Sequence, residues 1–249
     1  MPPPPVVELR DVRKSFESHQ VLRGVSFALD RGTTLAVMGG SGSGKTVLLR
    51  IVDGLIRPDS GAVSLFGTRI ESMREESMLP LRRRAGFVFQ GAALFDSLSV
   101  FENVAFPLRE HTALPLGEIT DRVHRLLELV GLPGTDDLLP AELSGGMRKR
   151  VGIARALVME PEVVFFDEPT AGLDPTNAKL VAELIAELRT GVADTAIVVT
   201  HDIEFADMVA DQMAILHQGT FAAVGSPAEI HGSANPDVRR FLAGELREI

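Results

Sequence analysis

The sequence predicts an α/β fold in which a core of strands and helices is interrupted by a helical insert. Short, wholly apolar runs at residues 163–166 and 196–199 are typical of strands that are buried on both faces. From about residue 71 to residue 160 the apolar residues instead recur with helical spacing, most clearly at 119–130. An order of strands, then helices, then alternating strands and helices indicates an α/β core with an inserted helical part.

The remaining elements follow in chain order. Residues 1–5 include a proline run that cannot form a helix or a central strand, so we expect a disordered tail. Apolar patterns then predict strands at 6–9, 25–29 and 35–38 and a helix at 45–56, with Leu55 and Ile56 on its apolar face. A turn cluster at 57–61 and a strand at 63–67 come next. An acid followed by proline, Asp174 and Pro175, predicts the start of a later helix.

Composition excludes several classes of protein. The 249 residues contain no cysteine, which excludes disulfides, thiolate metal sites and cysteine nucleophiles. The net charge is −9, so the chain has no overall electrostatic attraction to nucleic acid. No apolar run approaches the ~18 residues of a membrane span and no signal-peptide pattern opens the chain. We therefore expect a cytoplasmic protein that reaches a membrane only through a partner.

A glycine-rich loop predicts a phosphate-binding site. The segment 39–46 matches the pattern GxxxxGK[ST] and lies between a predicted strand and a predicted helix, as that pattern requires. Glycines allow the backbone amides to approach phosphate oxygens, and the helix adds the positive end of its dipole. Lysine neutralises the β- and γ-phosphates, and threonine offers a hydroxyl to Mg²⁺. The candidate residues are Gly39, Gly40, Ser41, Gly42, Ser43, Gly44, Lys45 and Thr46.

Two adjacent acids follow the buried strand at 163–166. Asp167 and Glu168 should lie at the carboxyl edge of the sheet, where α/β proteins bind ligands. Two such acids can have different roles: Asp167 binds the metal, and Glu168 lies beside the attacking water and acts as general base. The alternative is a solvated Asp-Glu-Pro turn.

A second anion site is predicted at the start of the helix that runs to about residue 157. Ser144 is a good helix cap, and Gly145 and Gly146 expose amides at the positive end of the helix dipole. One nucleotide needs only one phosphate loop, so this second site is expected to face the γ-phosphate held by another copy of the chain. The charged run at 148–150 is expected to be a solvated helix face.

The segment Leu143-Ser-Gly-Gly-Met147 resembles the LSGGQ signature of the ABC-transporter ATPases, and the resemblance covers nearly the whole chain. It implies a P-loop NTPase fold of the ABC ATPase type, with a RecA-like mixed-sheet core and an N-terminal antiparallel β part. It also implies one domain over 6–249, with the core at 6–88 and 161–249 and a helical subdomain at about 89–160. Mg²⁺-ATP is the implied ligand, and a homodimer is the implied working state.

The resemblance also assigns roles to single residues. Gln90 matches the Q-loop, which senses Mg²⁺ and the attacking water. Asp174 ends a segment like the D-loop, which crosses the dimer interface, and His201 matches the switch histidine on the γ-phosphate. Phe16 occupies the place of the aromatic residue that stacks on adenine, although it could also be a core residue.

Three stretches resemble the Mla-type phospholipid-transport ATPases that serve Mce systems. They are the signature ending in Met147, a GALF-like segment after Gln90, and Phe106-Pro-Leu-Arg-Glu-His-Thr; the tail from Asn235 to Gly244 is also similar. The resemblance implies an MlaE-like permease, with an Mce-domain protein and a small STAS-type protein as possible further partners. The place of action would be the cytoplasmic face of the bacterial inner membrane.

Other interpretations remain open at this point. A small-solute transporter of the same family is one, and a soluble ABC ATPase that works on ribosomes or DNA is another. A nucleotide-binding module without turnover is a third, although Lys45, Asp167 and Glu168 are all present. The apolar segment 92–95 is expected either to be a docking patch for a helix of the membrane subunit or to place Leu94 and Phe95 in the core of the subdomain.

Overall fold

The computed structural model describes residues 4–189, 191 and 194–245, and the chain divides into two compact units. We call Met1–Arg82 with Asp194–Ile249 the P-loop unit and Arg83–Ala193 the signature unit. Residues 1–3 of the expected tail and residues 246–249 lie outside the described residues. The expected core at 6–88 and 161–249 and subdomain at 89–160 stay a prediction.

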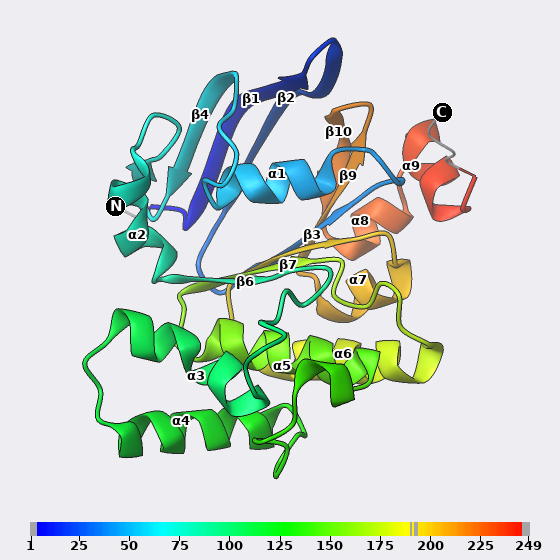
Figure 1. Ribbon diagram of the computed structural model, residues 1–249. Coiled ribbons are helices and arrows are strands. Elements are labelled where there is room, and N and C mark those ends of the chain that lie inside the picture. Colours follow the sequence, from blue (N-terminus) through cyan, green and yellow to red (C-terminus); the bar gives the residue numbers. More distant parts are fainter. Residues whose placement is uncertain (1–3, 190, 192–193, 246–249) are drawn as a thin grey trace. The chain divides into compact units, whose positions relative to one another are not determined.

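An antiparallel sheet of order β2-β1-β4-β5 forms the first part of the P-loop unit (Figure 1). Alternate residues of β1, including Val7 and Leu9, are buried, so one face of this sheet packs on the core. The expected antiparallel β part is thus confirmed, with longer strands than the sequence predicts. The strands are β1 (Val7–Phe16), β2 (His19–Leu29), β4 (Ser60–Leu65) and β5 (Thr68–Arg69).

Four further strands of the P-loop unit lie in the order β10-β9-β3-β8. The central strand β3 is parallel to β8 and β9, whereas β10 is antiparallel to β9, so the pairing is mixed. Every residue of β3 and of β8 is buried, as expected for strands covered on both faces. The strands are β3 (Thr34–Met38), β8 (Ala196–Thr200), β9 (Gln212–His217) and β10 (Thr220–Gly225).

The helices of the P-loop unit cover these strands and include the chain's last described helix. Met38 of β3 shares one apolar cluster with Val238 and Phe241, so the C-terminal helix packs in the same core as the central strand. The helices are α1 (Lys45–Val52), α2 (Glu75–Arg82), α7 (Ile203–Val209), α8 (Pro227–His231) and α9 (Pro236–Leu242).

Helix α1 is shorter than predicted. The apolar spacing continues to Ile56, but the helix ends at Val52, with Asp53 as its C-cap. Gly54 follows in a left-handed conformation (φ 71°), which is a common way to end a helix. The prediction that Leu55 continues the apolar face is wrong, because this side chain is 47% exposed.

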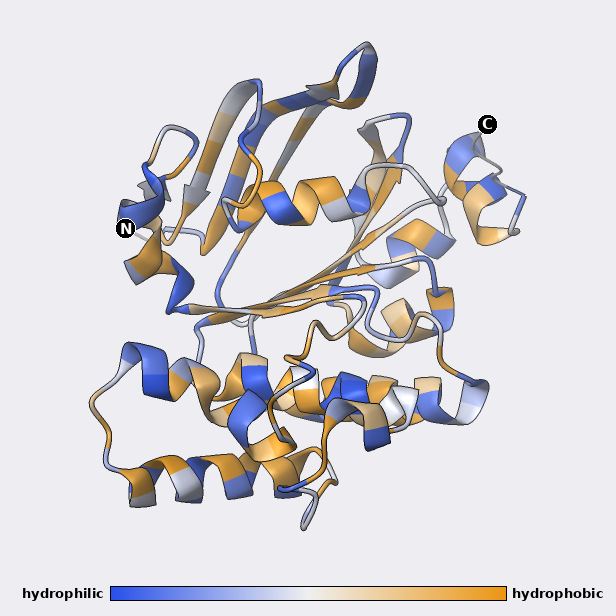
Figure 2. Ribbon diagram, in the orientation of Figure 1, coloured by the Kyte–Doolittle hydropathy of each residue, from blue (hydrophilic) through white to orange (hydrophobic). Residues whose placement is uncertain are grey.

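The signature unit combines one parallel strand pair with a group of helices. Strand β6 (Ala85–Val88) pairs with β7 (Val163–Asp167), and every residue of β7 is buried. Figure 2 shows β7 as a hydrophobic strand, while α4 carries both hydrophobic and hydrophilic residues. Across the described ranges, no helix combines the length and apolar character needed to cross a bilayer. The helices of this unit are α3 (Val100–His111), α4 (Leu116–Leu129), α5 (Gly145–Leu157) and α6 (Pro175–Leu188).

Candidate functional site

The glycine-rich loop connects β3 directly to α1, as the motif requires. Gly42 and Gly44 have φ values of 85° and 100°, which favour glycine. A Cβ atom on Gly44 would also lie 2.8 Å from Cγ1 of Val21, and one on Gly39 would lie 2.3 Å from the carbonyl oxygen of Leu216. Glycine is therefore required here both by backbone conformation and by close packing.

Two side chains give the loop the polarity of an anion site. The ammonium of Lys45 is buried and donates hydrogen bonds to the carbonyl oxygens of Gly39 (2.9 Å) and Gly40 (2.8 Å). The hydroxyl of Ser43 is buried and has no hydrogen-bond partner among the residues that the structure describes. A buried polar atom without a partner is costly, and a phosphate oxygen would satisfy this hydroxyl. The loop residues thus fit a nucleotide phosphate.

His201 lies next to this loop in the strand order. Met38 and Thr200 are partners in the parallel pairing of β3 and β8, and Gly39 and His201 are the residues that follow them. The carboxyl ends of neighbouring parallel strands meet at one edge of a sheet, so His201 and the phosphate loop share that edge.

Phe16 is at the end of β1 and is 45% exposed, so the alternative that it is a core residue is wrong. It pairs with His19 of β2, the strand whose Val21 would contact a Cβ atom on Gly44. The ammonium of Lys14 lies 5.3 Å from the centre of its ring. An exposed aromatic ring is thereby held on the strand pair that borders the phosphate loop.

The predicted carboxylates and Gln90 meet in the signature unit at the end of the β6–β7 pair. Phe166 pairs with Val88, so Asp167 and Glu168 leave the sheet at the same edge as Gln90. Both acids are buried, which excludes the alternative of a solvated turn. Glu168 has a φ of 48°, a conformation that a residue with a side chain rarely adopts.

Lys149 is a polar residue of this site that sequence reasoning missed. The run 148–150 was expected to be solvated, but Lys149 is buried and donates hydrogen bonds to the carbonyl oxygens of Gln90 and Glu168, the latter at 3.0 Å. Burial lowers the pKa of Lys149 from its usual value, while the carboxylates of Asp167 and Glu168 oppose that shift. The expectation of a solvated face is therefore wrong for Lys149.

The signature segment forms a capped helix start. The hydroxyl of Ser144 accepts a hydrogen bond from the Met147 amide (3.2 Å) at the first turn of α5. A Cβ atom on Gly146 would lie 2.5 Å from Oδ1 of Asn177, whose amide donates to the Asp174 carboxylate (2.6 Å). This bond and a second one from the backbone amide of Asn177 lower the pKa of Asp174. The signature and the segment that ends in Asp174 are thus packed together.

The apolar segment after Gln90 divides between core and surface. Ala92 is buried and Leu94 is half-buried, but Phe95 is 43% exposed. The ring of Phe95 lies 4.6 Å from that of Phe106, which is also exposed. We call Phe95 and Phe106 the phenylalanine pair. The alternative that places Phe95 in the core is wrong.

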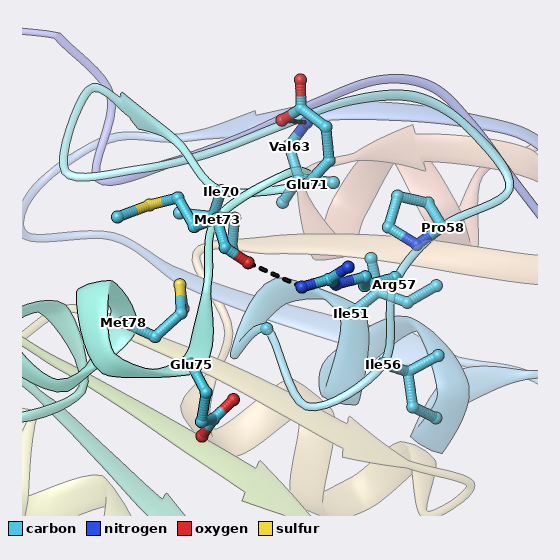
Figure 3. A pocket seen from close by; sticks show the side chains of 11 residues that line it. Ile51, Ile56, Arg57, Pro58, Val63, Ile70, Glu71, Met73, Glu75 and Met78 are labelled. Atoms are coloured by element: carbon cyan, nitrogen blue, oxygen red, sulfur yellow. Dashed lines mark hydrogen bonds between the residues drawn. The ribbon is translucent and has the colours of Figure 1, made fainter.

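A small cavity lies near the end of α1, lined by Ile51, Arg57, Met73 and Met78 among others (Figure 3). Arg57 closes one side by donating a hydrogen bond to the carbonyl oxygen of Met73 (2.8 Å). Its volume of about 30 Å³ is enough for one or two water molecules but not for a nucleotide. The phosphate loop remains the candidate ligand site of this unit.

Fold and site together define a P-loop nucleotide-binding protein, and comparison with known proteins narrows the class. A family model described as "ABC transporter" matches residues 22–171. Two solved cassettes have the same fold. One is the ATP-binding cassette MJ0796 in a dimeric post-hydrolysis state bound to ADP and Pi; it is 30% identical, has a TM-score of 0.82, and the match covers 89% of this chain and 98% of that chain. The other is cbiO1 of Clostridium perfringens, which is 31% identical with a TM-score of 0.83; the match covers 96% of this chain and 95% of that chain.

Named relatives cover most of the chain. The phospholipid transport ATP-binding protein MlaF of Escherichia coli is 40% identical over 96% of this chain and 89% of its own length. The probable ribonucleotide transport ATP-binding protein mkl of Mycobacterium leprae is 38% identical over 98% of this chain and 70% of its own length. Protein TRIGALACTOSYLDIACYLGLYCEROL 3 of Arabidopsis thaliana is 41% identical over 97% of this chain and 74% of its own length. The chain belongs to the ABC transporter family and is an ATP-binding ATPase of that family.

Proposed function

We propose that this chain is the ATP-hydrolysing subunit of a transporter that moves phospholipid in the bacterial envelope. The observation that carries the proposal is the 40% identity to MlaF over 96% of the chain. The signature ending in Met147 and the segments after Gln90 and from Phe106 support it, because none belongs to the general ABC pattern.

The P-loop unit supplies the groups that bind the phosphates and the adenine of ATP. The loop amides and Lys45 bind the phosphates, the buried hydroxyl of Ser43 donates to one phosphate oxygen, and Phe16 stacks on adenine. Oxygen ligands are those that Mg²⁺ prefers, and the hydroxyl of Thr46, the carboxylate of Asp167 and the amide oxygen of Gln90 are of that type. Bound Mg²⁺ would neutralise phosphate charge.

Hydrolysis requires catalytic side chains of this chain and groups of a second copy. Glu168 accepts a proton from the attacking water, and His201 donates a hydrogen bond to the γ-phosphate. Ser144, Gly145 and Gly146 of a second copy close over that phosphate, and Asp174 lies at the dimer interface. Loss of the γ-phosphate removes the group that joins the two copies, so the dimer opens.

The partners follow from the same proposal. The phenylalanine pair is the docking site for a cytoplasmic helix of an MlaE-like permease, because exposed apolar patches are typical of interaction sites. An Mce-domain protein and a small STAS-type protein complete the assembly at the cytoplasmic face of the inner membrane. Nucleic acid is not a partner, since the net charge is −9.

Affinity purification from native membranes tests the transport assignment. Mass spectrometry should identify an MlaE-like permease and co-purifying phospholipid. A small-solute permease with its binding protein, or a ribonucleotide as suggested by the name of mkl, would overturn it. Purification with ribosomes or DNA would favour the soluble alternative.

The variant Glu168→Gln tests the catalytic assignment. The amide cannot accept the proton, so turnover should fall at least about 100-fold, the lower range for general base catalysis, while ATP binding is retained. Size-exclusion chromatography with ATP should then show a trapped dimer. A variant that hydrolyses ATP at the wild-type rate would exclude Glu168 as the base.

A further inference from the structure

The ammonium of Lys149 joins the backbones of two segments that the proposed function places beside the attacking water. One is the carbonyl of Gln90 and the other is the carbonyl of Glu168, at 3.0 Å. The side chain is buried and comes from α5, the helix whose first turn is the signature. One charged group therefore connects three functional segments of the signature unit.

The backbone of Glu168 needs such a restraint. Its φ of 48° is in the left-handed region, where a residue with a side chain is strained. Strained conformations persist at functional sites only when surrounding contacts fix them. The Glu168 carbonyl accepts from Lys149 and from the amide of Ala171 (3.2 Å), so both bonds hold this conformation.

The segment after Gln90 is fixed by the same helix. Ala92 and Ala93 have φ values of 61° and 48°, and the guanidinium of Arg155 donates to both of their carbonyl oxygens, at 2.7 and 2.8 Å. A Cβ atom on Gly152 would lie 3.2 Å from Cβ of Ala92, so α5 approaches this segment closely. Lys149, Gly152 and Arg155 thus form one continuous contact along the helix.

We propose that Lys149 is a positioning residue for ATP hydrolysis. It holds the Glu168 carboxylate and Gln90 in fixed positions relative to the signature helix. The proposal rests on the proposed function, which makes Glu168 the base. Lys149 does not act on the nucleotide. Its two hydrogen bonds set where the base lies, and a misplacement of about 1 Å can lower turnover about 100-fold.

Two neutral variants separate hydrogen bonding from charge. Lys149→Met has nearly the same length and no donor, whereas Lys149→Gln keeps an amide that can reach one of the carbonyls. ATPase activity is measured in the purified transporter complex. We expect kcat to fall about tenfold to a hundredfold in the methionine variant and about threefold in the glutamine variant. The KM for ATP should stay within about twofold of the wild-type value in both variants, because the proposed ATP-binding residues belong to the P-loop unit.

The matched control is Lys179→Met, which removes an exposed lysine from α6 of the same unit and should leave kcat unchanged. Unchanged kcat in Lys149→Met would overturn the inference, as would equal losses in kcat and in ATP affinity. Should Lys149→Met fail to fold, Lys149→Gln decides, and an unchanged kcat would contradict the inference.

Glu168→Gln is measured in the same complex. If it stays active, the base assignment and this inference fail together; if it is inactive while Lys149→Met is not, only the inference fails.

Discussion

Asp53 gives a prediction whose magnitude follows from the structure. This C-cap of α1 is buried, and burial raises its pKa from 3.8 to about 7, with Arg82 opposing the shift and Glu75 adding to it. One pKa unit corresponds to about 1.4 kcal/mol, so a shift of roughly three units corresponds to a free energy of about 4 kcal/mol. The folded protein therefore binds a proton near neutral pH that the unfolded chain has already lost.

The sign of the pH dependence follows from this difference. A carboxyl group with a raised pKa favours folding fully below pH 3.8 and loses that contribution as the pH rises towards 7. Asp53→Asn replaces the acid with a neutral group of similar shape, so the variant should lack this loss. Relative to wild type, the variant should therefore be about 4 kcal/mol more stable against unfolding at pH 8 than at pH 4.

Urea unfolding at several pH values tests this expectation. The chain has no Trp and no Tyr, so circular dichroism is the suitable signal. Asp59→Asn is the matched control with the opposite sign, because hydrogen bonds from Lys14 and Ser15 lower the pKa of that exposed carboxylate. A difference between Asp53→Asn and wild type that is the same at both pH values would refute the assignment of a buried, protonated carboxyl.

Three further variants test the site. Ser43→Ala removes a buried hydroxyl without a described partner, so thermal unfolding should show the ATP-free protein about 1 kcal/mol more stable, with weaker ATP binding by calorimetry. Gly39→Ala places a Cβ atom 2.3 Å from a backbone oxygen, so ATP binding should be lost in a filter assay, and normal binding would disprove the close packing. Phe95→Ala should reduce permease recovery in pull-downs without changing the unfolding temperature by more than about 2 °C, since the ring is exposed.

The phosphate loop and the buried strands could be predicted because their signals are local. Positive φ values favour glycine, as at Gly42 and Gly44, and strands covered on both faces have uninterrupted apolar runs. The early end of α1 was missed because Leu55 and Ile56 continue its apolar spacing, whereas Gly54 ends the helix through its backbone conformation.

The burial of Lys149 could not be predicted from the charged run around it. Its acceptors lie 59 and 19 residues away in the chain, so only the tertiary structure brings them together. A weak signal did exist, because Gly152 and Ile153 follow at the spacings of three and four that share one helix face, and both are buried. A lysine on a face with such neighbours is a candidate for a buried cation.

The apolar cluster that joins Met38 to Val238 and Phe241 has a consequence for biosynthesis. The strand that leads into the phosphate loop is synthesised before all the other elements of this cluster, and the last of them is the helix that carries Val238 and Phe241. A ribosome must therefore synthesise the chain through Phe241 before this strand acquires its full covering. The nascent protein should therefore bind nucleotide only after the helix that carries Val238 and Phe241 has been synthesised, and not when the glycine-rich loop emerges from the exit tunnel.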